Sequence, residues 1–213
     1  MKLLVTLALA VVCGSASLLA QQDKIDKSLI PPIVATLPSA DIQGFEEYPP
    51  AVKELLESCL ALTRENLGYF YGSASPDQKG MDCSGTLYFV LRKNGIKDVP
   101  RSSAEQYRWA KEKGTFVPTT ATKLDSPEFA NLKPGDLLFW SGTYNTTAAA
   151  SHAMIYVGKA KSDGLMIMVG ASDGRTYRGK KCYGVSVFDF RLPKAESKSK
   201  FLGYARVPGL AGY

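Results

Sequence analysis

The chain has 213 residues, 45% of them hydrophobic and 22% charged, and a formal net charge of +6. These values are typical of a globular protein with one domain plus extensions, and they argue against a disordered chain or a collagen-like repeat. The sequence holds a single histidine, His152, which excludes multi-histidine zinc motifs and leaves one residue for any histidine-dependent catalysis.

The N-terminus has the pattern of a secretory signal peptide. Lys2 precedes an apolar run over residues 3–12, which is too short to span a bilayer, and small residues follow it. We expect residues 1–20 to be removed by cleavage after Ala20, with Ala16 as the alternative. Lipidation of Cys13 is disfavoured, because a bulky valine stands where lipoprotein signals need a small residue. The mature chain should be secreted or periplasmic, with no integral membrane segment.

Residues 21–50 hold five of the twelve prolines, so they predict an extended N-terminal arm rather than a domain. Whether this arm lies against the body of the protein or occludes a cleft is open at this point. Residues 51–213 should form one domain. The basic charge favours an anionic partner such as a cell wall, or it only aids solubility. No block of basic and interleaved aromatic residues supports binding to nucleic acid.

Hydrophobic periodicity predicts helices in the first part of the domain and strands in the second. Helices are expected from near Pro50 to Gly68, over residues 84–94, and from Ser102. Strands are expected over residues 137–140, 152–157, 165–170, 185–188 and 201–207, with a hairpin at Asp163-Gly164. This order indicates an α+β fold in which N-terminal helices pack on an antiparallel C-terminal sheet.

Three cysteines remain after signal removal, and an odd number in an exported protein suggests a free thiol. Cys59 lies on an apolar helical stripe, which favours a buried, reduced residue. Whether Cys59 and Cys182 form a disulfide is open.

Cys83 stands where a polar loop gives way to a helix, with Asp82 as the expected N-cap. A helix N-terminus stabilises a thiolate, and its backbone N–H groups can hold the oxyanion of a tetrahedral intermediate. His152 would be the base that such a nucleophile needs. The alternative from the residues alone is a buried structural cysteine and an unrelated histidine.

Four blocks of sequence, in this order, resemble the NlpC family of peptidoglycan cysteine peptidases. They are Gly68-Tyr69-Phe70-Tyr71-Gly72-Ser73, Asp82-Cys83-Ser84-Gly85, Pro100-Arg101-Ser102-Ser103 with Gln106, and Leu132 to Trp140 followed by Ser151 to Gly158. The resemblance covers roughly residues 52–207 and implies a papain-like fold.

The resemblance also implies a function and a site. Cys83 would attack an amide carbonyl and His152 would act as base and then acid, in hydrolysis of peptidoglycan stem peptides at a D-γ-glutamyl-diamino acid bond. Tyr69 would shape the cleft, and Asp82 and Ser84 would contribute to the cleft or to substrate contacts. Arg101 would line the cleft or only anchor its own loop.

One family position departs from the pattern. The family has a third polar residue on the strand after the histidine, and Gly170 stands there in this chain. Only acids and hydroxyls remain among the side chains, so His152 would be oriented by a backbone carbonyl, by water or by Asp173. We expect a Cys-His dyad that survives loss of Asp173.

The expected partner is peptidoglycan or a muropeptide, and the expected state is a monomer. No metal or other cofactor is needed for this mechanism. The same dyad would also serve an N-acetylmuramoyl-L-alanine amidase or another acyl transferase. A non-catalytic wall-binding module that kept the fold is the third alternative.

Overall fold

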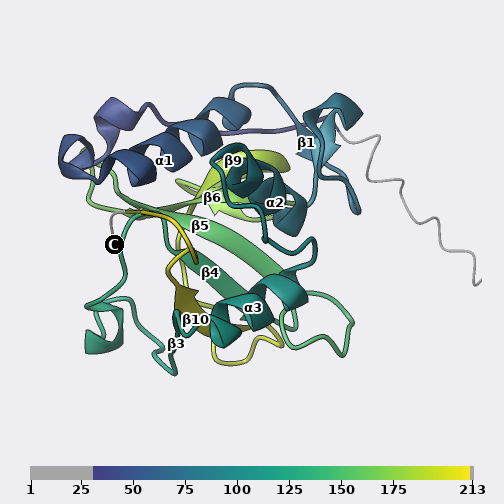
Figure 1. Ribbon diagram of the computed structural model, residues 1–213, viewed down its shortest axis with the longest axis vertical. Coiled ribbons are helices and arrows are strands. Elements are labelled where there is room, and N and C mark those ends of the chain that lie inside the picture. The colour runs from purple at the N-terminus through teal and green to yellow at the C-terminus, as the bar shows by residue number, and fades with distance from the viewer. Residues whose placement is uncertain (1–30, 212–213) are drawn as a thin grey trace, which may run out of the picture.

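The computed structural model describes residues 31–211, and their fold is α+β, with helices first and a large antiparallel sheet later (Figure 1). The α-helices are α1 (Pro50–Thr63), α2 (Cys83–Lys93) and α3 (Ser103–Glu112). The strands are β1 (Gly68–Tyr69), β2 (Gly80–Met81), β3 (Phe116–Pro118), β4 (Leu137–Ser141), β5 (His152–Lys159), β6 (Met166–Ser172), β7 (Thr176–Tyr177), β8 (Lys180–Lys181), β9 (Gly184–Asp189) and β10 (Lys200–Ala205). The predicted fold class is confirmed.

Six strands form the main sheet in the order β3-β10-β4-β5-β6-β9, and each pair of neighbours is antiparallel. Strand β5 lies inside this sheet, and its first residue, His152, pairs with Trp140 of β4. The expected hairpin joins β5 to β6, with Gly164 at φ +70° in its turn. Two short pairs, β1 with β2 and β7 with β8, lie outside the main sheet.

The sheet separates two hydrophobic cores, because successive side chains of a strand point to opposite faces. Ala153, Ile155 and Val157 of β5 belong to the larger core, which also holds the apolar faces of the three α-helices. Met154 and Tyr156 belong to the smaller core on the other face, together with Trp140 and aromatic residues of the C-terminal half. Buried side chains therefore hold β5 on both faces.

The helix ends follow from local backbone signals. α1 ends at Thr63 rather than near Gly68, and Asn66 then takes a left-handed conformation at φ 53°, which cannot continue a helix. α2 stops before Gly95, which has φ +86°. α3 begins after Ser102, whose side chain forms the expected capping box with Glu105.

The described part of the arm lies against the body along β9. Ala35 donates its backbone N–H to Ser186 Oγ at 3.0 Å and accepts from the Val187 N–H at 3.0 Å. Further along, Ile42 forms a β-bridge with Ala160 at the end of β5. The described part of the arm therefore packs on the domain.

The predicted signal peptide, residues 1–20, lies outside the described residues, as do residues 21–30 of the arm. Within residues 31–211, no helix has both the length and the apolar character needed to cross a membrane.

Candidate active site

Cys83 is the first residue of α2, and Asp82 is its N-cap, as the sequence predicts. The Asp82 carboxylate accepts the backbone N–H of Gly85 at 2.6 Å, which satisfies one of the free donors of the first turn. Both side chains are buried. The helix start therefore fixes Cys83 where the backbone N–H groups of a helix N-terminus converge.

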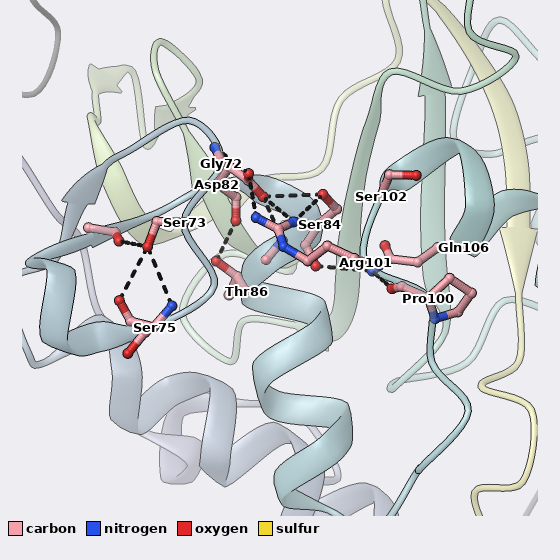
Figure 2. A network of polar contacts seen from close by, with 12 residues as sticks. Gly72, Ser73, Ser75, Asp82, Ser84, Thr86, Pro100, Arg101, Ser102 and Gln106 are labelled. Carbon is pink, nitrogen blue, oxygen red and sulfur yellow. Dashed lines mark hydrogen bonds and ion pairs between the residues drawn. The ribbon is translucent and has the colours of Figure 1, made fainter.

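The Asp82 carboxylate is the centre of a polar network that joins three segments (Figure 2). Arg101 donates to both of its oxygens, and the closer contact is an ion pair of 2.8 Å. The backbone N–H of Gly72 donates at 2.8 Å and Ser84 Oγ at 3.2 Å. Arg101 thus anchors its loop to the start of α2, and it also lines a small pocket that contains Cys83; its part in substrate binding stays a prediction.

Gln106 ties α3 to the same helix start (Figure 2). Its side-chain amide donates to the backbone carbonyls of Ser84 and Pro100, each at 3.0 Å. The residue is fully buried. Residues 100–103 and Gln106 therefore hold the start of α2 in place through backbone and side-chain contacts.

Gly85 is required by a close approach of backbone. A Cβ added at this position would lie 2.0 Å from the carbonyl oxygen of Ser73, which real side chains do not tolerate. That carbonyl also accepts the backbone N–H of Asp82 at 3.1 Å, so the loop around residue 73 is bound to the helix start. The glycine of the Asp-Cys-Ser-Gly block is thus a packing requirement.

The Cys83 thiol is neutral in the resting structure. Burial raises its pKa to about 11, and the nearby Asp82 charge adds to the effect. The backbone N–H groups of Ala153, Ser84 and Cys83 itself favour the thiolate and oppose this shift. The N–H of Ala153 belongs to the peptide that follows His152, so the sulfur lies beside the start of β5.

The His152 imidazole packs on Trp140, with 5.7 Å between ring centroids. Its Nε2 accepts a hydrogen bond from Arg175 Nε at 3.2 Å. Burial and the Arg175 charge hold the pKa of His152 well below its usual range. A neutral imidazole has one donor and one acceptor nitrogen, so an arginine donor at Nε2 places the proton on Nδ1.

Gly170, expected from the resemblance at the family's third position, has no side chain that could reach His152. Gly170 lies on β6, and a Cβ added there would lie 3.1 Å from Met154 Cγ, an apolar neighbour. The polar residue that contacts the imidazole is Arg175, from the loop after β6. The side chains expected to orient His152 were acids and hydroxyls, so Arg175 was not among them. Asp173 and His152 line one open groove, and the role of Asp173 as a third catalytic member stays a prediction.

An open groove of about 1550 Å³ runs past His152, and a smaller pocket of about 260 Å³ lies beside Cys83. The groove and the pocket are two parts of one cleft, because four residues line both: Tyr69, Tyr71, Tyr144 and Ser151. Burial and the neighbouring Cys83 raise the pKa of Tyr69, so this tyrosine lies near the thiol, and its role in shaping the cleft stays a prediction. Tyr71 belongs to the same sequence block as Tyr69, while nothing in the sequence pointed to Tyr144.

The larger groove is predominantly basic. Its charged lining residues are four cationic and two acidic side chains: Arg175, Arg191, Lys194, Lys198, Asp173 and Asp189. Residues 31–50 of the arm do not line either part of the groove. The described arm therefore leaves the groove open to an anionic ligand.

The three cysteines between residues 31 and 211 are all free, so Cys59 and Cys182 do not pair. In the same stretch of chain, no group of three or more His, Cys, Asp or Glu side chains is arranged to hold a metal ion. A buried cysteine at a helix start, beside the strand that begins with a histidine, is the kind of site that thiol-dependent acyl-transfer enzymes use.

Comparison with known proteins agrees with this class. Residues 66–178 match the NlpC/P60 family, and the chain belongs to that family. A gamma-DL-glutamyl hydrolase of Bacillus subtilis is 30% identical over 154 residues, which cover 66% of this chain and 32% of the relative. The chain thus spans about a third of that relative's length. A solved NLP/P60-family structure of Staphylococcus aureus, similar to a lipoprotein, is 23% identical with a TM-score of 0.45, covering 74% of this chain and 41% of that one.

Proposed function

We propose that this protein is an exported cysteine peptidase that hydrolyses peptidoglycan stem peptides at γ-glutamyl-diamino acid bonds. The observation that carries the proposal is the position of Cys83, at a helix N-terminus and within reach of the peptide that follows His152. Membership of the NlpC/P60 family and the hydrolase named among its relatives support it. The basic groove suits the carboxylates of a cell-wall peptide.

The chemistry follows from the two side chains. The Cys83 thiol gives its proton to His152, and the sulfur attacks the scissile carbonyl carbon. Backbone N–H groups of the first turn of α2 stabilise the oxyanion. The imidazolium then protonates the leaving amine as the C–N bond breaks, which leaves an acyl-enzyme. Water attacks this thioester with His152 as base, and the thiol is restored.

Digestion of purified sacculi by the Cys83→Ala variant tests the proposal. The wild-type chain should release fragments with stems shortened at the γ-glutamyl bond, and the variant should release none, as measured by mass spectrometry. Cys182→Ala is the matched control, because that buried cysteine lies outside both parts of the groove. Release of intact stems would instead identify the amidase alternative, and activity retained by Cys83→Ala would refute a cysteine mechanism.

A non-catalytic wall-binding module is the second candidate, and the Arg175–His152 contact favours it. An arginine donor at Nε2 and a thiol with a pKa of about 11 describe a pair that is not poised for catalysis at rest. Such a module would bind sacculi in a pelleting assay while releasing no fragments. Its Cys83 would react with iodoacetamide no faster in the presence of wall fragments than in their absence.

A further inference from the structure

Arg175 is held in the groove by contacts that leave its charge unpaired. Its Nε donates to His152 Nε2 at 3.2 Å, and its guanidinium lies over the Trp140 ring, 4.3 Å from the centroid. Within residues 31–211 it forms no ion pair with a carboxylate. Three other arginines do have such partners: Arg101 with Asp82, Arg178 with Asp163, and Arg191 with Asp189. Burial lowers the pKa of Arg175 only to about 10, so the residue stays charged at neutral pH.

The terminal nitrogens of Arg175 are available to a ligand. A guanidinium has five N–H donors, and the contact with His152 uses the one on Nε. No acceptor in the described chain bonds the four donors of the two terminal nitrogens, and the side chain lines the larger groove. Paired N–H donors in this geometry match the two oxygens of a carboxylate.

The same contact prevents His152 from acting as a base. While Arg175 donates to Nε2, the ring proton is on Nδ1, and the imidazole has no free lone pair for the thiol proton of Cys83. A protonated His152 would also set an N–H against the arginine N–H and a positive charge beside the guanidinium. The guanidinium must therefore turn away before His152 takes up a proton.

We propose that Arg175 is the receptor for a free carboxylate of the substrate, and that this contact draws the guanidinium away from His152 and frees the imidazole to act as base. The inference rests on the proposed function, because a γ-linked glutamyl residue keeps its α-carboxylate free near the scissile carbonyl. A substrate with an amide in place of that carboxylate leaves Arg175 on the imidazole. Arg175 thus makes turnover depend on a negatively charged acyl group.

Nuclear magnetic resonance of the imidazole tests the first half of the proposal. His152 is the only histidine, so its ring nitrogen signals in the untagged chain need no assignment. The wild-type ring should be the Nδ1–H tautomer and resist protonation, whereas in Arg175→Met its pKa should rise because the guanidinium charge is removed, although burial still lowers it. Saturating glutarate should shift the wild-type ring in the same direction and leave Arg175→Met unchanged. An Nε2–H tautomer, or no response to the substitution, would overturn the proposal.

Alkylation of Cys83 tests the second half without any substrate. The ratio of the rates with iodoacetate and iodoacetamide, followed on the Cys83 peptide, should fall about tenfold in Arg175→Met, because a charge-assisted contact is lost. Arg175→Lys, which keeps a charge without the paired donors, should give a ratio between those of the wild type and Arg175→Met. Arg191→Ala is the matched control, since that arginine lines the same groove but already pairs with Asp189, and it should change the ratio less.

The outcomes separate this proposal from the proposed function. If the ratio is the same in wild type and Arg175→Met, Arg175 is no carboxylate receptor, whatever the chain does to sacculi. If the ratio falls as expected while sacculi remain intact, the carboxylate site stands and the peptidase function fails.

Discussion

Replacing Gly85 by alanine tests whether the position of the start of α2 depends on its close contact with the loop around Ser73. The added Cβ would lie 2.0 Å from Ser73 O and 2.9 Å from Asp82 Oδ1, against ordinary contacts of 3.4–4 Å. The backbone must therefore open by more than an ångström. Overpacking of this kind costs about 1–3 kcal/mol, and alanine's better helix propensity offsets about 1 kcal/mol at most.

The loop cannot move away freely, because Ser73 is bound on two sides. Its carbonyl accepts from Asp82 N at 3.1 Å, and its hydroxyl donates to Gly80 O at 2.6 Å. We expect a net loss of about 2 kcal/mol, which lowers the melting temperature by about 4–8 °C for a domain of this size. A displacement of about 1 Å at Cys83 should also slow turnover roughly 100-fold.

Thermal unfolding and sacculus digestion measure the two effects. Gly68→Ala is the matched control, because its Cβ would meet its nearest neighbour, Lys79 O, at an ordinary 3.6 Å. A Gly85→Ala protein with the wild-type melting temperature would refute the packing argument. Lower stability with unchanged turnover would show that the helix start does not set the position of Cys83.

Three further predictions concern charge and reactivity. Burial raises the pKa of Asp136 to about 7, so its contribution to stability is complete below about pH 4 and is lost as the pH rises through 7. The melting temperature of the wild type should therefore fall over this pH range, and that of Asp136→Asn should change less. Equal slopes of melting temperature against pH in the two proteins would contradict this. Arg101→Ala should lower the free energy of unfolding in urea by about 1–2 kcal/mol, because Asp82 keeps its backbone donors and Arg101 is partly exposed. The control Arg108→Ala, at an exposed position, should lower it by less than about 0.5 kcal/mol. Iodoacetamide should modify Cys83 before the other two described cysteines, at a rate that rises up to about pH 11, as peptide mapping would show.

Local patterns predicted most of the fold and the elements that carry the site. The capping residues Asp82 and Ser102 and the stop at Gly95 all act within one turn of helix, so they can be read from neighbouring residues. The five expected strands correspond to β4, β5, β6, β9 and β10. The short strand β3 was missed, because three residues ending in proline give no alternation to recognise.

The contacts that decide the chemistry lie beyond such patterns. Arg175 reaches His152 from 23 positions away, through a loop whose path depends on the whole sheet. Its contact with Trp140 is likewise set by tertiary packing. Sequence patterns therefore predicted Cys83 and His152 as the reactive pair, whereas the contact that holds His152 depends on the three-dimensional arrangement.

The contact of Ala35 with β9 affects how the edge of the main sheet behaves in solution. β9 is an edge strand of the main sheet, and without the bond from the Val187 N–H to Ala35 O it would present an unsatisfied N–H group to other chains. The opposite margin, β3, ends in Pro118, which offers no donor. Both edges are thus partly protected against intermolecular strand addition, and a chain trimmed to start at residue 51 would expose the Val187 N–H at one of them and become more prone to self-association.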